Sequence, residues 1–85
     1  MEVTVRLFAT FRQEAGWTER QTRVPEGSTV RDLLGLLEEE AGVRLKGRPV
    51  YAAVNQEYTT PDRLLNDGDE VALFPPVSGG SSGRA

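Results

Sequence analysis

The chain has 85 residues, 38% of them hydrophobic, with a formal net charge of −3 and neither cysteine nor histidine. This composition predicts one small domain and excludes disulfides, cysteine- or histidine-dependent nucleophilic catalysis and ordinary zinc sites, so we do not expect a self-sufficient enzyme. No apolar run approaches the roughly 20 residues that span a bilayer, the N-terminus lacks a signal-peptide pattern and the arginines are scattered, so we expect a cytoplasmic protein that binds neither membranes nor nucleic acid.

The N-terminal part predicts a strand, a short helix and a second strand. Apolar and polar side chains alternate over residues 2–10, and one face of this strand carries Val3, Val5 and Leu7. Residues 11–15 offer about one helical turn, which Gly16 ends. Residues 18–24 are extended but polar on both faces, so we interpret them as an outer strand paired with the first.

The main helix is predicted for residues 30–41. Pro25-Glu26-Gly27 is typical of a turn, and Thr29 with Asp32 has the spacing of a capping box. Apolar residues then recur at helical spacing: Val30, Leu33, Leu34, Leu37 and Ala41. Gly42 follows, so the helix has one apolar face and a defined end.

Two more strands are predicted, at residues 50–54 and 70–74. Residues 55–57 are expected to turn the chain, and residues 66–69 are a strong turn signal before the last strand. Between these turns, we expect Leu64 and Leu65 to pack under the core.

This order of elements predicts an α+β fold. One amphipathic helix has a single face to bury, so it should lie across one side of a mixed sheet. The strands at 3–7 and 71–74 are the most apolar and are expected at the sheet centre. If they are neighbours, the crossover that contains the helix makes them parallel. The prediction is therefore the ubiquitin-like β-grasp arrangement.

The same alternation places apolar side chains on the sheet face opposite the helix. That face would carry Phe8, Ala53, Ala72 and Phe74 at the root of the C-terminal tail, which is typical of a partner-docking surface. The alternative is that Phe8 ends its strand and packs with Phe11 on the short helix as a small secondary core.

The charged residues elsewhere in the sequence do not indicate a further functional site. Glu38, Glu39 and Glu40 fit a solvated helix end better than a contact with a basic partner. Asp67, Asp69 and Glu70 are better explained by turn chemistry than by cation binding, so no metal site is expected. Several arginines either meet an acidic partner or are ordinary surface residues: Arg6, Arg12, Arg44 and Arg48.

The C-terminal stretch, FPPVSGGSSGRA, has two interpretations. Pro75 and Pro76 cannot continue a strand and direct the chain away from the sheet. Gly79 and Gly80 have no side chains, so their backbone fits a passage too narrow for other residues. This pattern suits an arm that carries a carboxylate, but a Gly/Ser-rich segment is also typical of a flexible linker or a disordered end.

Four segments resemble the small sulfur carriers of the MoaD/ThiS family, and among them the small subunit of molybdopterin synthase. They are VRLFATFRQEAG at 5–16, PEGSTVRDLL at 25–34, AAVNQEY at 52–58 and LLNDGDEVALFPPVSGG at 64–80. The last is the most specific, because it joins the turn, the strand, the two prolines and the glycine pair in one order. The resemblance extends from the first strand to Gly80.

The resemblance implies a carrier that binds no cofactor itself. An E1-like, MoeB-like enzyme would use ATP and Mg²⁺ to adenylate the terminal glycine, and sulfur would then displace AMP to give a thiocarboxylate. A MoaE-like large subunit would receive the tail and use the sulfur in molybdenum cofactor biosynthesis. In this sequence Gly80 would carry the sulfur, the arm would consist of Pro75, Pro76, Val77, Ser78 and Gly79, and Phe8 and Phe74 would be the hydrophobic contacts.

The departure from the family pattern is the five residues after Gly80. They place Gly80 in a peptide bond with Ser81, so Gly80 cannot be adenylated while they remain. Either a protease cleaves the Gly80–Ser81 bond, or residues 81–85 are a linker remnant or an artificial addition. We therefore expect a carrier domain at 1–80 and a disordered extension at 81–85.

Other functions stay open at this point. A carrier of this kind could supply sulfur for tRNA thiolation, cysteine synthesis or thiamine synthesis. It could be a protein modifier that is conjugated through Gly80. From a different class, it could be a ubiquitin-like interaction domain whose Gly/Ser segment is a linker.

Overall fold

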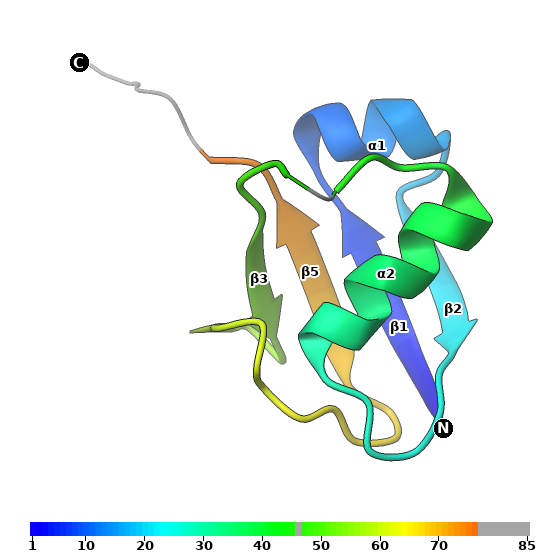
Figure 1. Ribbon diagram of the computed structural model, residues 1–85, viewed down its shortest axis with the longest axis vertical. Helices are drawn as coiled ribbons and strands as arrows, with labels where there is room; N and C mark the ends of the chain where they lie inside the picture. Colours follow the sequence, from blue (N-terminus) through cyan, green and yellow to red (C-terminus); the bar gives the residue numbers. More distant parts are fainter. Residues whose placement is uncertain (46, 77–85) are drawn as a thin grey trace.

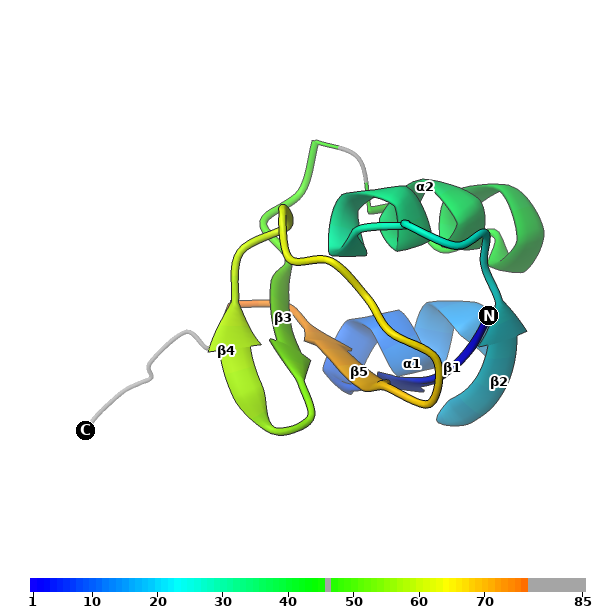
Figure 2. The same ribbon diagram turned by 90° about the horizontal axis from the view of Figure 1, so that it is seen from below.

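The computed structural model describes residues 1–45 and 47–76. Its elements are β1 Glu2–Leu7, α1 Ala9–Ala15, β2 Glu19–Arg23, α2 Val30–Ala41, β3 Tyr51–Val54, β4 Glu57–Thr59 and β5 Glu70–Phe74. The α2 helix lies across one face of the sheet, and α1 lies beyond the end of β1 (Figures 1 and 2). No helix in the described ranges has the length and apolar character needed to cross a membrane.

The strands form one mixed sheet in the order β2-β1-β5-β3-β4. At its centre β1 and β5 are parallel, with Val5 opposite Val71 and Leu7 opposite Leu73. The other pairs are antiparallel. The predicted central parallel pair and the outer position of β2 are therefore confirmed, as is the β-grasp arrangement. Because β1 and β5 are parallel and adjacent, their C-terminal ends lie at the same end of the sheet. There α1 follows β1, and Pro75 and Pro76 follow β5.

The core lies between the sheet and α2. The helix buries Val30, Leu33 and Leu37, as its periodicity predicts. The sheet contributes Val3, Val5, Leu7, Ala52, Val54, Val71 and Leu73. Phe11 of α1 is completely buried and closes the end of this core.

The start of α2 is fixed by the predicted capping box. The Asp32 amide donates to the Thr29 hydroxyl at 3.2 Å, and the Thr29 amide donates to the Asp32 carboxylate at 2.9 Å. A cap of this kind contributes about 1 kcal/mol. Gly42 ends the helix in the left-handed conformation, as expected.

Two predictions between β3 and β5 are wrong. Glu57 is not part of the turn but begins β4, because the turn consists of Asn55 and Gln56 alone, with φ of 52° and 71°. Positive φ at both central residues is what a type I′ hairpin turn requires. Leu65 is buried as expected, whereas Leu64 is 59% exposed. The backbone is extended there, as shown by the bridge between Thr29 and Leu64, so successive side chains point to opposite sides.

Candidate functional site

The candidate site lies on the sheet face opposite α2, where β5 leads into the C-terminal segment. Phe8, Ala9, Tyr58, Ala72, Phe74, Pro75 and Pro76 line a hollow there, which we call the aromatic groove. Phe8 follows β1 directly and Tyr58 lies on β4, so segments far apart in the sequence meet at this position. The groove contains three of the four predicted docking residues.

The fourth predicted docking residue, Ala53, lies next to the groove. It is the register partner of Ala72 on β5 and of Tyr58 on β4. It is half-buried and is not among the groove-lining residues. Small side chains at Ala53 and Ala72 leave room for the aromatic rings around them.

Phe74 is the central aromatic residue of this surface. Its ring and the Phe8 ring form an edge-to-face pair, with 6.4 Å between the ring centroids and an interplanar angle of 89°. The Tyr58 and Tyr51 rings lie 5.8 Å and 6.1 Å from it. Edge-to-face and tilted pairs at these separations are favourable, so the rings support one another.

Phe8 faces solvent and not the core. It is 44% exposed, whereas Phe11 is fully buried. The alternative in which these two rings share a small secondary core is therefore wrong. Phe8 lines the groove and packs its ring against Phe74, whereas Phe11 belongs to the main core.

Tyr58 is a groove residue that the sequence pattern did not identify. It is 81% exposed, the highest value among the exposed large hydrophobic residues of the described chain. The signal that could have found it is the hairpin: with a turn of two residues, Ala53 pairs with Tyr58 and both point to the same face.

The root of the predicted arm is part of the groove. Pro75 and Pro76 form one end of its wall. Several predicted arm and cleavage residues lie outside the described residues: Val77, Ser78, Gly79, Gly80 and Ser81. Their roles stay predictions. A partner that fills the groove would contact the chain at the point where it departs toward Gly80.

The acidic residues of the 66–69 turn accept hydrogen bonds that hold the turn in place. Asp67 accepts a hydrogen bond from the Glu2 amide at 2.8 Å. Asp69 is buried and accepts from the Asn66 amide at 2.8 Å and the Asn55 side chain at 2.9 Å. Within residues 1–45 and 47–76, no group of three or more acidic side chains could hold a metal ion. These hydrogen bonds confirm the predicted turn chemistry for Asp67 and Asp69. For Glu70 the prediction is wrong, because this residue begins β5 and its carboxylate pairs with Arg6.

Two of the four arginines considered from the sequence are engaged within the fold. Arg6 pairs with Glu70 at 2.8 Å and with Glu19 at 3.1 Å. Arg48 pairs with Glu14 at 2.9 Å, and this hydrogen bond is the main cause that lowers the pKa of Glu14 below its ordinary value. Arg48 also lies over the Phe11 ring, 5.1 Å from its centroid, so it fastens the loop before β3 to α1.

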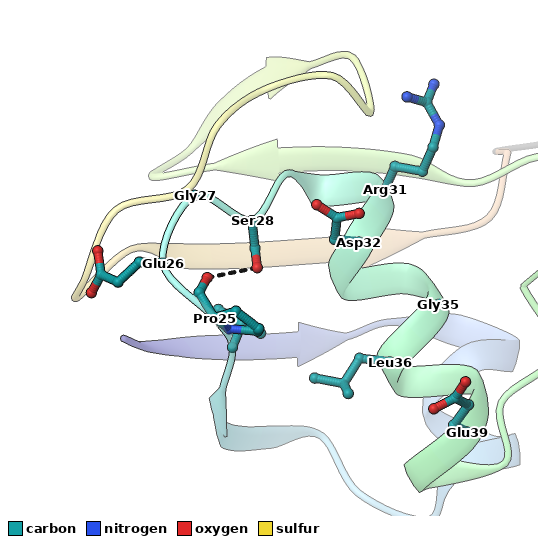
Figure 3. A pocket seen from close by; sticks show the side chains of 10 residues that line it. Pro25, Glu26, Gly27, Ser28, Arg31, Asp32, Gly35, Leu36 and Glu39 are labelled. Carbon is teal, nitrogen blue, oxygen red and sulfur yellow. Dashed lines mark hydrogen bonds between the residues drawn. The ribbon is translucent and has the colours of Figure 1, made fainter.

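A second hollow lies beside the N-terminal half of α2 (Figure 3). Its charged side chains point in different directions (Figure 3), and most have partners: Glu26 with the N-terminal amine, Arg31 with Asp62, and Asp32 in the helix cap. The Ser28 hydroxyl donates to the Pro25 carbonyl at 2.6 Å, so it is not poised as a nucleophile. This hollow therefore offers no convergent chemistry, and the aromatic groove is the better candidate.

Known proteins are similar in sequence to this chain along nearly its full length. Residues 5–80 match the model of the ThiS family. A molybdopterin synthase sulfur carrier subunit from Chlamydomonas reinhardtii is 36% identical, over 94% of this chain and 100% of the relative. Small archaeal modifier protein 3 from Haloferax volcanii is 39% identical, also over 94% of this chain and 100% of the relative.

Solved structures share the fold. A Pyrococcus furiosus protein assigned to subunit 1 of the molybdopterin converting factor is 38% identical, with a TM-score of 0.80 over 91% of this chain and 99% of that chain. A chain in the complex of subunits 1 and 2 of the molybdopterin-converting factor from Helicobacter pylori is 27% identical, with a TM-score of 0.67 over 94% of this chain and 100% of that chain. Together with the match over residues 5–80, these likenesses show that the chain belongs to the ThiS/MoaD family of ubiquitin-like β-grasp proteins.

Proposed function

We propose that this protein is a sulfur carrier for molybdenum cofactor biosynthesis, equivalent to the small subunit of molybdopterin synthase. The observation that carries the proposal is the continuity of the aromatic groove with Pro75 and Pro76, which lead to the Gly79-Gly80 pair. The relative from Chlamydomonas reinhardtii, a molybdopterin synthase sulfur carrier subunit, supports the pathway.

The proposed chemistry takes place on the Gly80 carboxylate after residues 81–85 are removed. A carboxylate is a poor acceptor for a nucleophile. An E1-like enzyme with ATP and Mg²⁺ would let a carboxylate oxygen attack the α-phosphorus, so that pyrophosphate leaves and an acyl-adenylate forms. A sulfur nucleophile would then attack the carbonyl carbon, and AMP would leave with the broken C–O bond. Because the sulfur is carried on the main-chain carbonyl, the absence of cysteine is no obstacle.

The groove gives this chemistry a docking site. A partner's apolar side chains would cover Phe8, Tyr58 and Phe74, which line the groove at the root of the arm. Phe8 and Tyr58 are exposed, and Phe74 is half-buried between them. Aromatic anchors of this kind dominate the affinity of many protein interfaces. An extended segment of six residues, such as 75–80, reaches about 20 Å, so a domain held at the groove can place Gly80 deep inside its partner. The Helicobacter pylori complex of subunits 1 and 2 supports a large subunit as that partner.

The Gly80–Ser81 bond is the proposed control point. The ThiS family match ends at residue 80, and the five residues that follow would block both adenylation and sulfur transfer. A processing protease would therefore be the first partner, an E1-like activating enzyme the second, and the large subunit the third.

A protein modifier is a second candidate function. It is favoured by the 39% identity to small archaeal modifier protein 3. Both functions would require an exposed Gly80 carboxylate and its adenylation. They differ in the nucleophile that attacks the adenylate-derived intermediate: sulfur in a carrier, and a lysine amine of a target protein in a modifier.

The proposal is tested by adenylation in vitro. The chain ending at Gly80 and the chain ending at Ala85 are each incubated with the E1-like enzyme of the same organism, ATP and Mg²⁺, and pyrophosphate release is measured. We expect release only with the shorter chain, and less release when that chain carries Phe74→Arg. No release from the chain ending at Gly80 would overturn the proposed function.

A further inference from the structure

Ala9 connects the aromatic groove to the core through an unusual backbone conformation. Its φ is 55°, in the left-handed region. Among described residues other than glycine, positive φ occurs elsewhere only at Asn55 and Gln56, where the hairpin turn requires it. Alanine is disfavoured in this region because its Cβ approaches the following carbonyl oxygen, and strained residues of this kind occur often at functional sites.

The chain is fixed on both sides of Ala9. Before it, Phe8 is still extended, with φ −126° and ψ 155°, and its amide donates to the Leu73 carbonyl at 3.2 Å, which continues the β1–β5 pairing. After it, the rest of α1, which begins at Ala9 itself, is anchored by the buried Phe11 ring. Ala9 is therefore the single residue that turns the chain between an outward-facing ring and an inward-facing one.

Ala9 also belongs to the site, because it is one of the residues that line the aromatic groove. Glycine would adopt the same φ without strain, but it would leave the neighbouring backbone freer. An alanine restricts the backbone next to Phe8 more than a glycine would. Restricting a binding residue in advance lowers the entropy lost on association.

We propose that Ala9 is a positioning residue of the docking site, which holds the Phe8 ring against Phe74 before any partner arrives. This inference rests on the proposed function, in which the groove binds the large subunit. The partner would meet a preformed apolar surface, and the strain at Ala9 would be offset by the buried Phe11 and the continued pairing of Phe8.

The test compares Ala9→Gly with Ala9→Asn, because asparagine keeps a Cβ and tolerates left-handed φ. Each variant is prepared as the full-length chain and as the chain ending at Gly80. Affinity for the large subunit from the same organism is measured by calorimetry. Hydrogen exchange gives the protection factor of the Phe8 amide in the free protein, and thermal melting checks the fold.

We expect Ala9→Gly to melt no lower than the wild type but to bind about three- to tenfold more weakly, with lower protection of the Phe8 amide. Ala9→Asn should keep the protection of the Phe8 amide, because its Cβ restricts the backbone as that of alanine does. A merely structural role for Ala9 predicts unchanged binding by Ala9→Gly, and that result overturns the inference. Weaker binding by Ala9→Gly with unchanged Phe8 protection also overturns it, because the loss would then come from the missing methyl group and not from the position of Phe8. Failure of the wild type to bind is a different result and counts against the proposed function itself.

Discussion

Replacing Phe8 by alanine should separate partner binding from folding. The Phe8 side chain keeps 44% of its surface exposed, so the buried part contributes about 1 kcal/mol to stability. Its edge-to-face contact with Phe74, at 6.4 Å, contributes about 0.5–1.5 kcal/mol more. The expected loss of unfolding free energy is therefore about 1.5–2.5 kcal/mol, and a domain of ordinary stability, about 5–15 kcal/mol, stays folded after such a loss.

The expected loss of affinity is larger. An aromatic anchor at the centre of an interface contributes about 2–4 kcal/mol to binding, so Phe8→Ala should weaken binding of the large subunit roughly 30- to 700-fold. Leu64→Ala is the matched control, because Leu64 is also exposed, at 59%, but does not line the aromatic groove. Calorimetric titration gives the affinity, and thermal melting confirms that both variants are folded. If Phe8→Ala binds as tightly as Leu64→Ala, the groove is not the docking site.

Three further predictions concern the fold. Asn55→Ala should lower the unfolding free energy by about 2–4 kcal/mol in urea titrations, because it removes both a hydrogen bond to the buried Asp69 side chain and a residue that tolerates left-handed φ. A loss below about 1 kcal/mol would show that the hydrogen bond between the two turns contributes little to stability. Gly35→Ala should raise the unfolding free energy by about 1 kcal/mol and the melting temperature by about 4–8 °C, because an added Cβ meets no atom within 4 Å and alanine is favoured in a helix interior. A melting temperature below that of the wild type would contradict this prediction. The pKa of Glu14 is lowered mainly by its hydrogen bond with Arg48, so the pair stabilises the folded state at pH values above the ordinary pKa of 4.5 and loses this effect as the pH falls through the lowered pKa. The difference in melting temperature between the wild type and Glu14→Gln should therefore shrink in acid, and a difference that grows in acid would refute the assignment.

Much of the fold is predictable because its elements have clear periodic patterns. The stripe of α2 and the alternation of β1 and β5 each define one buried face, and only a few topologies bury these faces together. The β4 strand could not be found in the same way. It has three residues, and its turn, Asn55 and Gln56, lacks the glycine that usually marks a type I′ turn.

The site was predictable in part for the same reason. Alternation places Phe74 and Ala72 on the outer face, and the structure brings them together with Phe8. Tyr58 was missed because its strand was missed. Phe8 was also expected on this face, and its backbone is still extended. The left-handed φ of Ala9, which follows it, is a backbone feature that no apolar pattern predicts and that is unexpected for alanine.

The claim that Gly80 carries sulfur is tested most directly by the mass of the protein isolated from its native cells. We expect a species that ends at Gly80 and in which one carboxylate oxygen is replaced by sulfur, and its amount should fall when the E1-like enzyme is deleted. A species joined through Gly80 to a lysine of another protein would indicate a modifier instead. If only the intact chain ending at Ala85 is found in cells that contain the E1-like enzyme, the sulfur-carrier account is wrong.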